Sequence, residues 1–108
     1  MGNSAADCAR ILTQEGADAL GANCGTIDPA EMAEIISSMS ACTTLPLAAE
    51  PNAGKPRLED GKTVFDMEPH VFALGLMECK AAGATLLGGC CGTRPSHIRA
   101  LVELLRQE

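Results

Sequence analysis

The sequence predicts an α/β fold in which parallel strands alternate with outer helices. Amphipathic helical segments and short apolar segments alternate along all 108 residues, which is typical of βα units. The apolar residues are almost all aliphatic, with two phenylalanines and no tryptophan or tyrosine. Such residues suit helices packed on a buried parallel sheet. The length accommodates one small domain, so we expect a single sheet with right-handed crossovers.

The first part of the chain predicts a helix followed by a short strand. The helix should run over residues 4–15, because Ser4 and Asp7 have the spacing of a capping box and Gly16 follows as a stop. Its apolar face comprises Cys8, Ile11 and Leu12. The strand is expected within residues 17–23.

A second helix and strand are indicated more strongly. Asp28 is a favourable N-cap, and Pro29 suits the first position of a helix that should end near Ser40. The residues spaced for its buried face are Met32, Ile35, Ile36 and Met39. Residues 45–50 (LPLAAE) predict a buried strand, and a turn-rich loop should follow it to about Thr63.

The last third of the chain repeats this order. A third helix should begin near Asp66 and end before Gly83, followed by a strand over residues 84–89. Its inner face comprises Phe72, Leu76 and Cys79. A final helix is expected after Thr93, with Ile98, Leu101, Val102 and Leu105 on its apolar face.

Charge and hydropathy exclude several classes of function. The formal net charge is −6 and the eight lysines and arginines are scattered, so nucleic acid is not an expected partner. Neither a leader sequence nor an apolar run of about 18 residues is present, so we expect a cytoplasmic chain without a membrane partner. The six cysteines are then expected as free thiols or metal ligands.

Two segments of the sequence resemble each other and end in cysteine. Residues 16–26 (GADALGANCGT) align without a gap with residues 83–93 (GATLLGGCCGT). Each copy is a strand that leads into a cysteine. Because the carboxyl ends of parallel strands meet at one edge of a sheet, Cys24, Cys90 and Cys91 should gather there.

These three cysteines predict a zinc site. Adjacent side chains of a straight strand point to opposite faces, but the glycines around Cys90 and Cys91 allow the chain to curl. Three thiolates suit zinc, and three protein ligands leave a fourth position open, as in catalytic sites. Such a site is a poor activator of water but a good holder of an incoming thiol, which suggests alkyl transfer to sulfur.

Simpler interpretations remain open for every one of these residues. Adjacent cysteines also occur as buried small apolar residues or in structural zinc sites. A thiol redox protein that uses Cys90 and Cys91 is a further alternative. The strain of a disulfide between adjacent residues argues against it. Of the other candidates, Cys8 and Cys79 are expected in the core, Cys42 is expected to be inert, and His70 and His97 are expected on the surface.

The motifs GANCG, PNAG and GGCCGT, followed by Pro and His-Ile, resemble the carboxyl-terminal part of the homocysteine S-methyltransferase family. The resemblance implies a (β/α)8 TIM barrel whose zinc is held by Cys24, Cys90 and Cys91. It also implies that homocysteine binds through its sulfur and receives a methyl group, giving methionine. The donor would be methylcobalamin, betaine, S-methylmethionine or a similar compound.

The resemblance also suggests two substrate-binding residues. It places Asn52 of PNAG close to the metal, where the amide would fill the open position in the absence of substrate. The sequence alone would favour an ordinary turn asparagine after Pro51. Glu50 ends the preceding strand and could bind the amino group of the substrate, although a solvated glutamate is an equal alternative.

The chain is too short for a complete barrel. Residues 1–108 match about the last three βα units, whereas such barrels typically need about 250 residues. We therefore expect a carboxyl-terminal portion of the barrel domain that self-associates or joins a partner supplying the missing half. The alternative to methyl transfer is a non-catalytic zinc-binding or assembly module derived from this fold.

Overall fold

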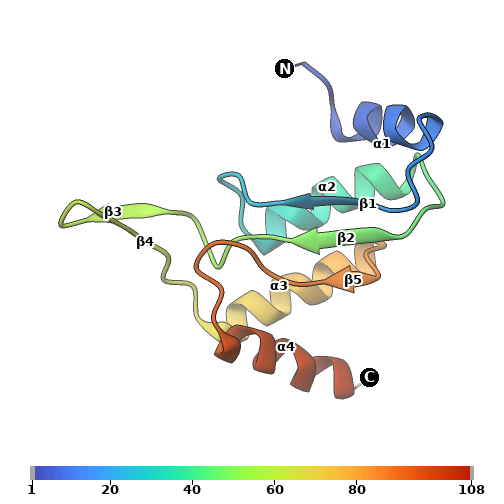
Figure 1. The fold of residues 1–108 in the computed structure, drawn as a ribbon. Helices are drawn as coiled ribbons and strands as arrows, with labels where there is room; N and C mark the ends of the chain where they lie inside the picture. Colours follow the sequence, from blue (N-terminus) through green and yellow to red (C-terminus); the bar gives the residue numbers. More distant parts are fainter. Residues whose placement is uncertain (1, 108) are drawn as a thin grey trace.

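A computed structural model describes residues 2–107. Three parallel strands form its main sheet in the order β1-β2-β5 (Figure 1). The strands are β1 (Leu20–Asn23), β2 (Leu47–Glu50) and β5 (Leu86–Leu87). The predicted alternation of helices with parallel strands is therefore confirmed, although each strand is shorter than its apolar segment in the sequence.

Within residues 2–107, four helices accompany the sheet. They are α1 (Ala5–Gln14), α2 (Pro29–Ser40), α3 (Pro69–Ala82) and α4 (Pro95–Arg106). α2 and α3 pack against each other and against one face of the sheet, while α1 packs on α2 and α4 packs on α3 (Figure 1). No helix in the described part of the chain is both long enough and apolar enough to cross a membrane.

Two of the helices begin as their capping residues predict. The Ser4 side chain accepts a hydrogen bond from the Asp7 N–H at the start of α1. The Asp28 side chain accepts one from the Glu31 N–H, with Pro29 as the first residue of α2. Both capping boxes are reciprocal, which satisfies amide groups that a helix start otherwise leaves unpaired.

The core lies between α2, α3 and the sheet. The predicted inner faces of these helices are confirmed, with Ile35 the one partly exposed member. α2 and α3 approach closely because Gly75 has no side chain, and a Cβ there would lie 2.4 Å from Pro29 Cβ. The buried residues of these two faces are Met32, Ile36, Met39, Phe72, Leu76 and Cys79.

The other face of the sheet is open. The register pairs Gly21 with Ala48, and Ala48 with Leu86, across the three strands. Leu86 and Gly21 are exposed, and Ala48 is half-buried. Only one face of the sheet is therefore covered by the helices described here.

The loop after β2 contains a hairpin that the sequence did not predict. Its strands are β3 (Arg57–Glu59) and β4 (Lys62–Val64), which pair antiparallel and project beyond the carboxyl end of the main sheet (Figure 1). Asp60 and Gly61 form the turn with φ of 51° and 76°, the pair of positive angles that Asp-Gly hairpin turns require.

The predicted face of α1 is wrong. Ile11 and Leu12 are 47% and 45% exposed, and Ala9 is the buried residue of this helix. α1 packs on α2 at one side of the molecule, so only a narrow stripe of it is covered. Cys8 is half-buried, so the predicted core position is confirmed for Cys79 and not for Cys8.

The prediction that His97 lies on the surface is also wrong. Its side chain is 6% exposed and contacts Phe72 edge to face, with ring centroids 5.2 Å apart. Nδ1 accepts a hydrogen bond from the Arg94 N–H at 3.1 Å, and Nε2 lies 2.8 Å from the Met67 carbonyl oxygen. His97 thus joins the start of α4 to the segment before α3, whereas His70 is exposed as predicted.

Candidate metal centre

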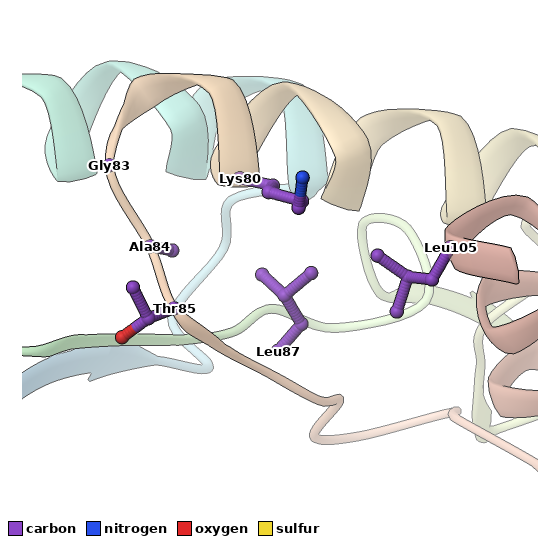
Figure 2. Close-up of a pocket in the computed structure, with 6 residues that line it drawn as sticks. All are labelled: Lys80, Gly83, Ala84, Thr85, Leu87 and Leu105. Carbon is purple, nitrogen blue, oxygen red and sulfur yellow. The ribbon is translucent and has the colours of Figure 1, made fainter. Parts of the chain in front are cut away.

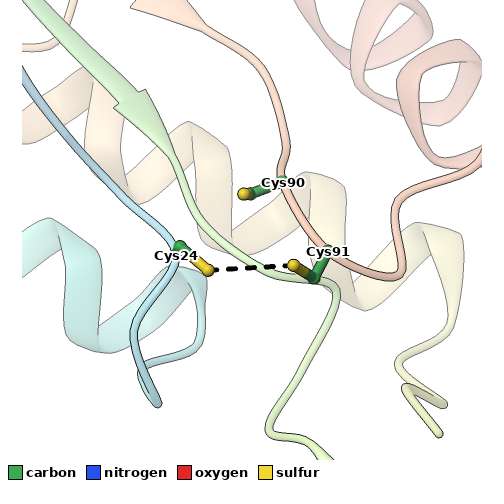
Figure 3. A group of neighbouring side chains, drawn as sticks. All are labelled: Cys24, Cys90 and Cys91. Carbon is green, nitrogen blue, oxygen red and sulfur yellow. Dashed lines mark hydrogen bonds between the residues drawn. The ribbon is translucent and has the colours of Figure 1, made fainter. Parts of the chain in front are cut away.

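The three predicted cysteines lie together at the carboxyl edge of the sheet. Cys24 follows β1, whereas Cys90 and Cys91 lie in the loop after β5 (Figure 3). Their Sγ atoms all lie within 4.8 Å of one another, and Cys24 Sγ is 3.7 Å from Cys91 Sγ. No other group of three potential metal ligands occurs within residues 2–107.

Left-handed backbone turns direct the two cysteine-bearing loops. Cys24 has a φ of 57°, an uncommon value for a residue with a side chain. The glycines that follow the matched cysteines, Gly25 and Gly92, have φ of 72° and 79°. The internal resemblance of the sequence thus extends to the backbone of these two glycines, although Cys91, which aligns with Cys24, has no positive φ. The curl expected around Cys90 and Cys91 is present.

The segment that continues β2 lies between the two cysteine-bearing loops. The Cys24 N–H donates to the Glu50 carbonyl oxygen at 3.2 Å, and the Cys90 N–H donates to that of Pro51 at 2.9 Å. The Ala53 N–H donates to the Cys91 carbonyl oxygen at 2.9 Å. Backbone hydrogen bonds on both sides of residues 50–53 therefore hold the two loops.

Asn52 lies within this segment and is 1% exposed. Its Nδ2 donates to the Gly25 carbonyl oxygen at 2.8 Å, and its Oδ1 accepts from the Cys91 N–H at 3.1 Å. The structure thus brings Asn52 to the cysteine loops, as expected. Binding of its amide to substrate or metal stays a prediction.

Glu50 is exposed at the end of β2, on the open face of the sheet. A Cβ on Gly88 would lie 3.8 Å from its carboxylate oxygen, so the carboxylate lies beside the segment that leads to Cys90. Glu50 and Gly88 line a cavity of about 240 Å³ together with Ala48, Leu86 and Leu87. The predicted role of Glu50 in substrate binding remains a prediction.

The thiols affect one another's ionisation. The Asn23 amide, 3.8 Å from Cys90 Sγ, and next the Cys24 thiol hold the pKa of Cys90 below its ordinary value. Cys24 and then Cys90 raise the pKa of Cys91. Negative charge on one thiolate opposes ionisation of its neighbour, so the cluster favours a cation that would balance several thiolates.

The cluster fits zinc. A tetrahedral ion with zinc–sulfur bonds of about 2.3 Å requires sulfur atoms about 3.8 Å apart, and the Cys24–Cys91 separation is 3.7 Å. Thiolate sulfur is also a preferred donor for zinc. The group has three members in the described part of the chain, so a tetrahedral ion held by them would have a fourth coordination position for another ligand.

A second cavity lies away from the cysteines. Its volume is about 480 Å³, and it lies between the end of α3, β5 and α4 (Figure 2). Leu87 and Leu105 point toward each other across it, and Ala84 and Thr85 place it at the amino end of β5. Active sites of parallel α/β folds lie at the opposite end of the strands.

Two residues near the site were not predicted from the sequence. Asn23 belongs to the quoted GANCG motif, but its contact with Cys90 depends on how the second loop folds. His97 supports residues 50–53 through Met67. The Met67 carbonyl oxygen contacts His97 Nε2, and the Met67 N–H donates to the Ala53 carbonyl oxygen at 3.2 Å. Its position two residues after Pro95 gave a signal for a helix start, not for burial.

Comparison with known proteins agrees with these observations. The sequence model of a family described as homocysteine S-methyltransferase matches residues 1–105. Methionine synthase of Mycobacterium leprae is 41% identical over 85 residues, which cover 78% of this chain. Homocysteine S-methyltransferase 4 of Zea mays is 31% identical over 94 residues, and homocysteine S-methyltransferase 3 of Arabidopsis thaliana is 32% identical over 114 residues.

The chain spans only part of each of these relatives. The matched region covers 7% of the mycobacterial protein. It covers 27% of the maize protein and 31% of the Arabidopsis protein, with 83% and 99% of this chain included.

Proposed function

Because the chain belongs to the homocysteine S-methyltransferase family, we propose that it carries the zinc-binding part of a site that methylates homocysteine to methionine. In this proposal residues 1–108 form the carboxyl-terminal portion of a (β/α)8 barrel domain. The parallel order of β1, β2 and β5 and the partial coverage of the relatives support it. The open face of the sheet would then face the interior of the barrel.

The observation that carries the proposal is the convergence of three thiol sulfurs at the carboxyl edge of the sheet. Cys24, Cys90 and Cys91 would hold the zinc ion. When bound there, zinc would lower the pKa of an incoming thiol and keep its sulfur nucleophilic near neutral pH. Because Cys91 is exposed and the other two are half-buried, a small thiol can reach the cluster from solvent.

The reaction is a transfer of a methyl group to sulfur. The homocysteine thiol would release its proton to solvent, and its sulfur would form a bond to the methyl carbon as the bond between that carbon and the donor breaks. The breaking bond's electron pair leaves with the donor. In this proposal the carboxylate of Glu50 would attract the ammonium group of homocysteine, which is supported by its position beside the segment leading to Cys90.

A second candidate is a non-catalytic zinc-binding or assembly module. Leu86 on the edge strand β5 is 55% exposed, which favours this candidate, because an exposed apolar edge can pair with another chain. Such a module would bind zinc without any preference for homocysteine.

Calorimetry with homocysteine separates the two candidates. We expect the zinc-loaded chain to bind L-homocysteine with release of a proton, and the metal-free chain to bind it far more weakly. Methionine, which has no free thiol, is the matched ligand control and should not bind. Equal binding of both ligands, or of neither, would favour the assembly module.

Glu50 can be tested in the same measurement. We expect Glu50→Gln to weaken homocysteine binding roughly two- to fivefold, the effect of losing one partly solvated charge pair. Glu34→Gln, at an exposed position of α2, is the control. An equal affinity for Glu50→Gln and the unaltered chain would remove Glu50 from the site.

A further inference from the structure

We propose that Asn52 is a positioning residue that sets the spacing of the three sulfurs, by joining the turn at Cys24 to the loop of Cys90 and Cys91. The inference rests on the proposed function, in which the three cysteines bind a metal ion. In the hydrogen bonds of the described residues, the Asn52 side chain contacts neither the Cys24 Sγ nor the Cys91 Sγ atom. Its two contacts are with the backbone of the two loops.

The first step of the argument is the connectivity of the amide. Nδ2 donates to the Gly25 carbonyl oxygen at 2.8 Å on one side, and Oδ1 accepts from the Cys91 N–H at 3.1 Å on the other. One planar group therefore connects the residue after Cys24 with Cys91 itself. The two cysteines lie 67 residues apart in sequence, and this side chain crosses the distance between their loops.

The second step is the conformation of the turn that the amide holds. Cys24 and Gly25 have φ of 57° and 72°, so a residue with a side chain occupies a left-handed turn. Few residues other than glycine adopt this conformation without support from their surroundings. The bond to the Gly25 carbonyl oxygen fixes the end of that turn, and with it the direction of the Cys24 side chain.

The third step is burial. Asn52 is 1% exposed, so neither amide atom can exchange its protein partner for bulk water. A buried donor or acceptor without a partner is unfavourable, which makes the observed arrangement strongly preferred. The amide supplies a donor for one loop and an acceptor for the other, whereas a carboxylate at this position lacks the donor and a leucine lacks both.

Two substitutions separate a positioning role from a direct role as a metal ligand. In Asn52→Asp the acceptor for the Cys91 N–H is kept, but a carboxylate oxygen faces the Gly25 carbonyl oxygen. We expect roughly 10- to 100-fold weaker binding of Co²⁺, measured by the absorption of its thiolate complex, as for other groups that orient metal ligands. A metal ligand would respond in the opposite way, because a carboxylate binds the cation more strongly than an amide.

Hydrogen exchange of the metal-free protein supplies a readout that does not depend on the metal. We expect the Cys91 N–H to exchange faster in Asn52→Leu than in the unaltered chain, and to keep its protection in Asn52→Asp. Leu101→Ala, a substitution in the core on α4, is the control for general loss of stability without loss of the Asn52 contacts. It should bind Co²⁺ with unchanged affinity.

Three results bear on the inference. Asn52→Asp binding Co²⁺ as tightly as the unaltered chain, or more tightly, would overturn it. Unchanged exchange of the Cys91 N–H in Asn52→Leu would also overturn it. If the unaltered chain binds no Co²⁺ while the exchange pattern appears as expected, the proposed function fails and the positioning role of Asn52 stands.

Discussion

Cys24 Sγ lies 3.7 Å from Cys91 Sγ, although 67 residues separate the two cysteines in the sequence. The parallel order of the strands explains this proximity. β2 lies between β1 and β5, and the segment that continues it binds the loops on both sides. The site therefore depends on the topology of the sheet as much as on the cysteines.

Each of the three clustered cysteines should be necessary for binding one equivalent of zinc. We expect Cys24→Ser, Cys90→Ser and Cys91→Ser to lower zinc content after dialysis, because a weaker ligand replaces a thiolate. Cys8→Ser is the matched control, since Cys8 lies on α1 outside the cluster. Elemental analysis checks this, and full zinc content in any of the three variants would contradict the assignment.

Cys79 should be inert to alkylation in the folded protein. Burial raises its pKa to about 11, and its thiol donates to the Pro29 carbonyl oxygen, with Sγ 3.4 Å from that oxygen. Because the pKa is raised, the thiol stays protonated as pH rises toward that value, and little thiolate forms near pH ~8. Mass spectrometry after brief iodoacetamide treatment should show modification of the zinc-free cluster before Cys79. Early modification of Cys79 would show that α3 opens readily.

Gly75→Ala should destabilise the packing of α2 on α3. The added Cβ would lie 2.4 Å from Pro29 Cβ, so the helices must move apart. We expect a loss of about 1–3 kcal/mol in the free energy of unfolding, despite the better helix propensity of alanine. Urea denaturation measures this loss. Leu74→Ala, at an exposed position of the same helix, should change stability by less than about 1 kcal/mol, and an equal effect of both substitutions would contradict the packing argument.

His97→Leu should destabilise the fold more than His70→Leu. Leucine keeps the volume of the buried side chain but leaves the Arg94 N–H and the Met67 carbonyl oxygen without their partner. We expect a cost of about 2 kcal/mol in the free energy of unfolding. His70 is exposed on α3, so its substitution should be nearly neutral. Coincident urea midpoints for the two variants would disprove the structural role of His97.

The sequence was most informative where local chemistry determines the structure. The capping residues of α1 and α2 determined those helix starts, and the repeated strand–cysteine pattern located the cluster. Contacts between distant segments were not predictable in this way. His97 is buried because α4 packs on α3. It lies four residues before Leu101 and so on the same helix face, but a histidine near a helix start gives no signal of burial by its residue type.

Two further differences have similar physical causes. Ile11 and Leu12 have helical spacing, but spacing alone does not say how much of a helix its neighbours cover. The hairpin of β3 and β4 is mostly exposed, so its strands lack the alternating apolar pattern that would have predicted them. The Asp60-Gly61 pair was the available signal for its turn.

X-ray absorption at the zinc edge tests the central claim most directly. We expect three sulfur neighbours in the zinc-loaded chain, from Cys24, Cys90 and Cys91, together with one lighter atom. Addition of L-homocysteine should raise the number of sulfur neighbours to four, whereas methionine should not. Fewer than three sulfurs in the zinc-loaded chain, or an unchanged spectrum with saturating homocysteine, would contradict a thiol-binding zinc centre.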